Sequence, residues 1–392
     1  MQTSVPRSAG SLSLWISGLV AVLIGYSSSA AIIFQAARAA GATPEQIGGW
    51  LSVLGIAMGI TSLGLSLRYR MPILTAWSTP GAALLATSFH GLSLHEAIGV
   101  FIFANILIVL SGITGLFARL MNHIPQAIAA AMLAGILLRF GLETFSALQH
   151  HFTFGGGMCL AYLLCRRWLP RYAILFALLS GVLIALWQEI LQFPAQPLRF
   201  LLPEPVMPHF TLPTLLGIGL PYFLVTMASQ NAPGIVTLQA HGYRPPVSAL
   251  MSWTGITALL LSPFGGFSVC VAAITAAICM NEEVHPDPQR RWIAAALAGL
   301  FYLLAGLSGA LIGTLLSALP LVLIQTLAGL ALLAPLGNSL LSALMHPRQR
   351  DAALIAFLIT ASGVSLLGIG AAFWGLTGGL LAHFLLSRPV AE

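Results

Sequence analysis

Apolar runs of about 20 residues follow one another along this chain, separated by short gaps that carry polar residues, glycine or proline. A helix needs a run of this length to cross the hydrocarbon core of a bilayer. Of the 392 residues, 58% are hydrophobic and only 7% are charged, whereas soluble proteins carry about 25% charged residues. The sequence therefore predicts an all-α polytopic membrane protein, with room for about 14 transmembrane segments and no soluble domain.

The predicted spans fall into two sets of seven, joined by a polar, proline-bearing outer linker at 193–212. The first set lies at 12–37, 45–66, 72–88, 94–118, 125–143, 147–165 and 171–191. The second set lies at 214–238, 246–261, 263–280, 290–311, 315–343, 351–367 and 370–387. Because seven is an odd number, the second half must enter from the opposite side. Residues 1–192 and 213–392 are therefore predicted to form two inverted seven-span repeats.

The basic residues indicate the orientation. All 16 are arginines, and almost all lie in the gaps between apolar runs, which is typical of membrane topology and not of nucleic-acid binding. With the N-terminus inside, only Arg38, Arg139 and Arg199 fall outside. The others fall inside: Arg7, Arg68, Arg70, Arg119, Arg166, Arg167, Arg171, Arg244, Arg290, Arg291, Arg348, Arg350 and Arg388. The positive-inside rule thus predicts that both termini are cytoplasmic.

Motifs for cofactor chemistry are not found in the sequence. The four cysteines lie in apolar segments without metal-ligand spacing. There is no Gly-x-x-x-x-Gly-Lys-Ser/Thr phosphate loop, so ATP is not expected to be the energy source. No catalytic constellation is found either. We therefore predict a protein that is not an enzyme and that has no metal and no cofactor.

The predicted spans 3 and 10 are broken. In span 3, Ser78 or Thr79 followed by Pro80 predicts a helix start after about seven extended residues. In span 10, the segment Ser262–Ser268 precedes the apolar run Val269–Ile278, which predicts a second half-helix. The N-termini of two inverted half-helices would face each other near the midplane and attract an anion, especially a carboxylate. The alternative is that Pro and Gly merely kink two ordinary spans.

Candidate substrate-binding residues lie on these broken spans and on the first and eighth spans. Trp77 and Phe267 precede the two half-helices symmetrically and could line a site. Gln230 and Asn231, just before a proline, form a more specific polar cluster than the serines, which often only join helices. The candidate set is Tyr26, Ser27, Ala76, Trp77, Ser78, Thr79, Ser229, Gln230, Asn231, Gly266, Phe267 and Ser268.

Three of these segments resemble the bacterial benzoate/proton symporter (BenE) family: 71–85, Ser229–Gly234 and Ser262–Ser268. The resemblance covers essentially the full length and extends to nucleobase/ascorbate and SLC4/SLC26-type carriers. It implies their fold, with a core domain of spans 1–4 and 8–11 and a gate domain of spans 5–7 and 12–14. In this numbering the core covers about 12–118 and 213–311, and the gate about 125–191 and 315–387. Relatives of this fold often dimerise through the gate, so a homodimer is an expectation.

The resemblance implies a secondary transporter of the bacterial inner membrane that carries benzoate or a similar aromatic carboxylate with a proton by alternating access. The carboxylate would lie between Ser78–Thr79 and Ser268–Val269, and the ring against Trp77 and Phe267. Gln230, with Asn231, Ser27 or Tyr26, would orient it.

The residues allow more than one route for the coupling proton and more than one class of substrate. None of the ten acidic residues lies at mid-membrane, so the proton would cross on the neutral acid or through a polar residue and water. Nucleobase carriers of this fold have acidic residues where this chain has Ser229 and about Ile274, which favours an anionic substrate. The alternatives are a nucleobase or inorganic-anion carrier of the same fold, or a passive anion channel.

Overall fold

The computed structural model describes residues 7–89, 91–115, 125–169, 172–191, 203–282, 284–364, 366 and 371–386. Within these ranges the protein is mainly helical, and eight helices are long and apolar enough to cross a membrane. Three shorter apolar helices accompany them. The prediction of a helical, polytopic membrane protein is confirmed, whereas the number of 14 spans stays a prediction.

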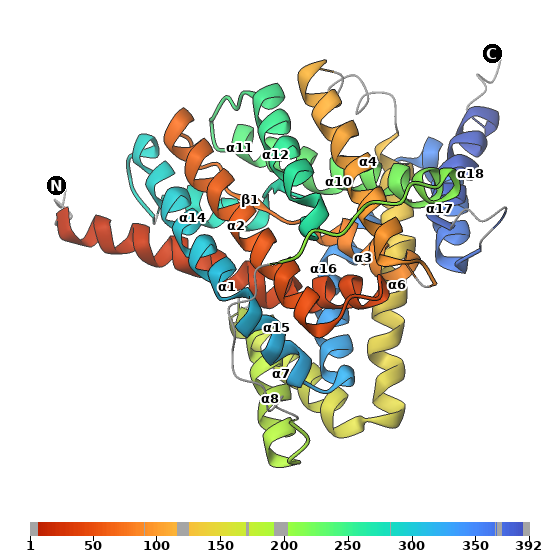
Figure 1. Ribbon diagram of the computed structural model, residues 1–392, viewed down its shortest axis with the longest axis horizontal. Coiled ribbons are helices and arrows are strands. Elements are labelled where there is room, and N and C mark those ends of the chain that lie inside the picture. The colour runs from red at the N-terminus through yellow and green to blue at the C-terminus, as the bar shows by residue number, and fades with distance from the viewer. Residues whose placement is uncertain are drawn as a thin grey trace.

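The helices and strands follow each other in two series (Figure 1). The first comprises α1 (Arg7–Ala39), α2 (Pro44–Tyr69), β1 (Thr75–Ala76), α3 (Thr79–Ser88), α4 (Leu94–Ile113), α6 (Gln126–His150), α7 (Phe152–Trp168) and α8 (Ala173–Trp187). The second begins with one helical run made of α9 (Leu212–Thr214), η2 (Leu215–Gly219), α10 (Leu220–Thr226), η3 (Met227–Asn231) and α11 (Ala232–Ala240). It continues with α12 (Val247–Leu261), η4 (Ser262–Phe264), β2 (Cys270–Val271), α13 (Ile274–Met280), η5 (Pro288–Arg290), α14 (Trp292–Leu307), α15 (Gly309–Ala318), α16 (Leu321–Leu344), η6 (Pro347–Gln349), α17 (Arg350–Ser362) and α18 (Ala371–Leu386).

The predicted spans 290–311 and 315–343 are wrong in their boundaries. The structure has three helices in this region, because α15 lies between α14 and α16. Leu319 is extended, with ψ 142°, and Pro320 follows it directly before α16. A proline disfavours the helical conformation of the residue before it, so α15 ends here and α16 begins as a separate helix.

Close helix packing depends on small residues. A Cβ atom added to Gly55 of α2 would lie 2.5 Å from the Cα of Gly306 in α14. Likewise, a Cβ on Gly313 of α15 would lie 2.6 Å from the Cα of Gly48. Glycine thus lets α2 approach α14 and α15 at backbone distance, as small residues commonly do between membrane helices. In Figure 1 these three helices lie together beside α1.

Two groups of helices differ in their packing partners. In one group, α2 packs on α14 and α15, α4 packs on α12, and α1 packs on α3, α13 and α14. In the other, α6 packs along α16 and α17, α7 along α8, and α17 along α18. The half-helix α3 contacts α1, α10 and α6, so it lies where the two groups meet.

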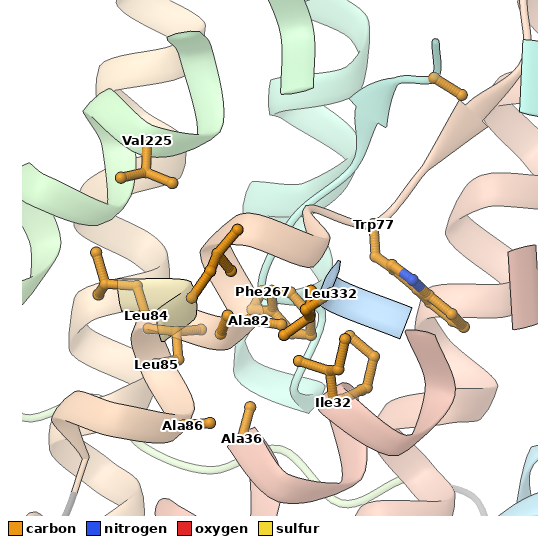
Figure 2. Packing of buried hydrophobic residues seen from close by; sticks show 14 of the residues in the cluster. Ile32, Ala36, Trp77, Ala82, Leu84, Leu85, Ala86, Val225, Phe267 and Leu332 are labelled. Carbon is orange, nitrogen blue, oxygen red and sulfur yellow. The ribbon is translucent and has the colours of Figure 1, made fainter. Parts of the chain in front are cut away.

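The buried core surrounds α3. Figure 2 shows Ala82, Leu84 and Leu85 of α3 near Ile32 of α1 and Val225 of α10. All five side chains belong to one cluster of buried hydrophobic residues. Because α3 is enclosed by apolar side chains, its first turn is held at a defined place inside the protein.

Candidate functional site

The two broken segments meet as a short antiparallel sheet. Thr75 of β1 is paired with Val271 of β2, and Ala76 with Cys270. The N–H of Ala272 also donates to the carbonyl oxygen of Leu74 at 2.9 Å. Backbone groups inside a membrane protein need internal partners, and here each broken segment supplies them to the other.

The first half-helix begins as its sequence predicts. Ser78 is the N-cap of α3, and its Oγ accepts the N–H of Gly81 at 3.0 Å. Thr79 is the first helical residue and Pro80 the second. The N–H of Thr79 has no acceptor within the helix, and it lies at the positive end of the helix dipole.

The second half-helix begins later than predicted. It starts at Ile274, so the expected start at Val269 is wrong. Gly265, with φ 88°, ends the short helix η4. The following residues stay non-helical because β2 pairs with β1 and because the Oδ1 of Asn231 accepts the N–H of Val271 at 2.9 Å. Ser268 therefore does not lie at a helix terminus.

Ser78 and Ser268 contact each other directly. The N–H of Ser78 donates to Oγ of Ser268 at 2.8 Å, and the hydroxyl of Thr226 donates to Oγ of Ser78 at 3.1 Å. Ser78 and Ser268 are both fully buried. These residues thus connect the two broken segments with α10, behind the surface that a ligand could reach.

A cavity of about 950 Å³ lies beside the start of α3. Five residues of the candidate set contribute to its wall: Ala76, Trp77, Thr79, Ser229 and Gln230. The first residues of α13 border it as well. Ser229 and Gln230 belong to the π-helical turn η3, a wide helical turn that is frequent at functional sites.

Trp77 is held in one orientation. Its Nε1–H donates to Oγ of Ser29 at 2.7 Å, and the hydroxyl of Ser29 donates to the carbonyl oxygen of Gly25 at 2.8 Å. The ring of Tyr26 packs edge-on against Trp77, with centroids 4.8 Å apart. Tyr26 is not part of the cavity wall, and its buried hydroxyl has no hydrogen-bond partner among the described residues.

Four other candidates lie away from the cavity or outside the described part. Phe267 is fully buried against Trp50 and Phe101, and its carbonyl oxygen accepts the hydroxyl of Tyr222 at 2.9 Å. Gly266 and Asn231 are likewise absent from the cavity wall. The side chain of Ser27 lies outside the described residues. The structure therefore does not bring Phe267 opposite Trp77.

Several polar residues of the cavity wall were not among the candidates. They are Ser29 of α1, Gln126 of α6, Tyr162 and Arg166 of α7, Thr275 of α13, Asn281, Tyr302 of α14, and Asn338, Ser339 and Ser342 of α16. One signal was available in the sequence: Asn338 and Ser342 stand one helical turn apart in an apolar helix. The others could not be recognised, because they come from several helices, α1, α6, α7, α13, α14 and α16, that meet at the cavity only in the folded protein.

Comparison with known proteins supports a transport function. Residues 9–385 match the BenE family, described as benzoate membrane transport protein. The chain is 56% identical over 372 residues to the inner membrane protein YdcO of Escherichia coli, covering 95% of each chain. It is 40% identical over 384 residues to the benzoate membrane transport protein of Acinetobacter baylyi, covering 97% of each. The family and the second relative are named for membrane transport, not for an enzymatic reaction.

Solved structures share the fold at low sequence identity. The transmembrane domain of the cyanobacterial bicarbonate transporter BicA matches with a TM-score of 0.61 at 12% identity, covering 95% of this chain and 97% of that one. SLC26A9 matches with a TM-score of 0.60 at 14% identity, and this chain spans 65% of its length. Since the family matches nearly the whole length, the chain belongs to the BenE family of benzoate membrane transport proteins.

Proposed function

We propose that this protein is a secondary active transporter of the inner membrane, which carries benzoate or a similar aromatic carboxylate together with a proton. The observation that carries the proposal is the cavity wall itself. It combines the indole of Trp77, the first helical residue Thr79 and the amide of Gln230. The indole can pack against the ring of an aromatic carboxylate, and the positive helix terminus and the neutral amide donor can bind its carboxylate group.

The proposed binding mode differs from the sequence-based expectation, in which the carboxylate lies between Ser78–Thr79 and Ser268–Val269. We propose that the carboxylate binds near the N–H of Thr79 and the side chain of Gln230, with the ring against Trp77. Ser78, Ser268 and Asn231 hold the broken segments in place through hydrogen bonds among themselves and to the backbone. Their contribution to binding is therefore positional.

Alternating access would arise from motion between the two helix groups described above, corresponding to a core and a gate. The cavity is lined by both, with Trp77 and Gln230 on one side and Leu133 and Leu330 on the other. It also includes Gln126 at the start of α6. The arginine distribution predicts that this end of α6 faces the cytoplasm. We therefore propose that the cavity is open to the cytoplasm.

Transport can be tested with purified protein in liposomes. We expect labelled benzoate to accumulate when the lumen is more alkaline than the medium, and a protonophore to abolish this accumulation. Protein-free liposomes measure the permeation of neutral benzoic acid, which is a minor species near pH 7 because carboxyl groups titrate near about 4. Uptake no greater than in protein-free liposomes would contradict the proposal.

Counterflow separates a carrier from a channel. Liposomes preloaded with unlabelled benzoate should transiently trap labelled benzoate if one site alternates between the two sides, whereas a passive pore gives no overshoot. Competition by uracil, xanthine and sulfate in the same assay addresses the substrate. Inhibition by uracil or sulfate at lower concentrations than by unlabelled benzoate would favour a nucleobase or inorganic-anion carrier.

A further inference from the structure

A cationic residue and a tyrosine occur together in the cavity wall, far from Trp77 in the sequence. Tyr162 and Arg166 lie one helical turn apart on α7. The Nη1 of Arg166 donates to the hydroxyl of Tyr162 at 2.8 Å, and its guanidinium carbon lies 5.6 Å from the centre of the tyrosine ring. The two side chains therefore form one unit in which the tyrosine positions the guanidinium.

The burial of this unit places it where the cavity reaches the surface. Trp77 and Tyr162 are each only 3% exposed, whereas Arg166 is exposed although it contributes to the same wall. The cavity thus extends from the buried indole to an exposed cation. A substrate that enters or leaves on this side would pass the guanidinium.

The charge of Arg166 is not matched by a carboxylate. Among the described residues of the cavity wall, no aspartate or glutamate is found. The ion pair found in the described part of the chain joins Arg290 and Asp287, away from α7. Arg166 also has further N–H groups beyond the one it gives to Tyr162, and that hydroxyl retains its own hydrogen to donate.

Taking the proposed function as its basis, the geometry points to a second carboxylate-binding station formed by Arg166 and Tyr162 at the mouth of the cavity. The guanidinium binds the carboxylate of an aromatic acid, and the tyrosine hydroxyl donates a further hydrogen bond. This station concentrates the anion before it moves to the deeper site, or receives it upon release. It acts on apparent affinity for substrate on this side, and less on the maximal rate.

The chain offers a matched control for this station. Arg167 is the neighbouring residue on α7, is exposed, and packs over the ring of Trp168 instead of lining the cavity. Replacing either arginine removes one positive charge from the same membrane end. Any effect on topology or on lipid headgroups is therefore shared by Arg166→Gln and Arg167→Gln, whereas an effect through the cavity is not.

We would measure uptake and counterflow of labelled benzoate with full-length protein in liposomes at low and high salt. Arg166→Gln should raise the half-saturating concentration about five- to tenfold, as expected for the loss of a charge-assisted hydrogen bond. Tyr162→Phe should raise it about threefold, and Arg167→Gln should leave it unchanged. The difference in half-saturating concentration between the wild type and Arg166→Gln should become smaller in 0.5 M salt, because salt screens exposed charges.

The outcomes distinguish this station from the transport function. If the wild type transports benzoate and Arg166→Gln has the same half-saturating concentration, the station is overturned and the transport function is not. The same conclusion follows if Arg166→Gln and Arg167→Gln raise the half-saturating concentration equally. Transport of benzoate by neither wild type nor variants would overturn the proposed function and the station together. The melting temperatures of all four proteins identify a variant that fails to fold. If Arg166→Gln fails to fold, the half-saturating concentration of Tyr162→Phe, which keeps the ring, decides whether the station exists.

Discussion

The backbone N–H of Ser78 donates a hydrogen bond of 2.8 Å to Oγ of Ser268, although 190 residues separate the two in sequence. Both residues are fully buried. The bond joins the start of α3 to the segment before β2, so this hydroxyl adds to the β1–β2 pairing that connects the two halves of the chain. A donor in such a place has no water to replace a lost acceptor.

Ser268→Ala should therefore destabilise the protein by about 1–3 kcal/mol, because it leaves the N–H of Ser78 buried without an acceptor. The melting temperature of the detergent-solubilised protein measures this effect. Ser180→Ala is the matched control, because among the described residues the hydroxyl of Ser180 donates only to the carbonyl oxygen of Ala177 in its own helix. Equal melting temperatures for the two variants would contradict the role assigned to Ser268.

Trp77→Phe should impair substrate binding more than folding. Phenylalanine keeps an apolar ring but loses the hydrogen bond to Ser29, which retains its own bond to Gly25. We expect the half-saturating concentration of benzoate to rise about three- to tenfold, equal to about 0.7–1.4 kcal/mol. Trp253→Phe, on a residue that is 56% exposed on α12, should have no effect. Unchanged affinity in Trp77→Phe would place the ring-binding surface elsewhere.

The glycines of α2 should differ sharply in their tolerance of alanine. In Gly55→Ala the new methyl group would lie 2.5 Å from the backbone of Gly306, so α2 and α14 must separate. A loss of about 1–3 kcal/mol is expected from such overpacking. In Gly64→Ala the new methyl group meets no atom of the described residues within 4 Å, and the higher helix propensity of alanine should stabilise the protein by up to about 1 kcal/mol. Thermal unfolding of both variants tests this contrast.

Arg291 should be important for stability although it has no acidic partner in the described structure. Its guanidinium is buried and donates to the carbonyl oxygens of Met280 and His285, both at 2.8 Å. Arg291→Met leaves these carbonyls unsatisfied and should cost about 2–4 kcal/mol. Arg291→Lys should rescue this only in part, because an ammonium lacks the planar fork of donors.

The neighbouring Arg290 is the control. It is exposed and lies 3.8 Å from Asp287, a solvent-exposed pair of the kind that contributes less than about 1 kcal/mol. Arg290→Met should therefore melt within about one degree of the wild type. A larger loss in Arg290→Met than in Arg291→Met would reverse the assignment.

Local signals made the first half-helix predictable. The preference of serine for the N-cap and of proline for the first helical turn acts within a few residues, so Ser78 and Pro80 were sufficient to place the start of α3. Length and hydropathy likewise predicted most helices, since the bilayer imposes both. These parts of the fold depend on interactions that are close in sequence.

The second half-helix was not predictable in the same way. The residues from Val269 to Ala273 are apolar and would continue a helix by pattern alone. They remain non-helical because β1 and Asn231, distant in sequence, supply their hydrogen bonds. Because α13 begins later than the sequence pattern predicts, Phe267 does not take the place that Trp77 has before α3. Phe267 is instead buried against Trp50, whereas Trp77 borders the cavity. Arg166 was expected only as a marker of topology, because its place in the wall depends on how α7 packs.

The pairing of β1 with β2 also sets an order of events during biosynthesis. Thr75 and Ala76 leave the ribosome long before Cys270 and Val271, which are their strand partners. An unsatisfied backbone group in hydrocarbon costs several kcal/mol, so the first broken segment cannot settle at its final depth alone. We expect α3 to complete its insertion only after translation has passed Val271. A nascent chain that stops earlier would expose an incomplete segment to the proteases that remove unassembled membrane proteins.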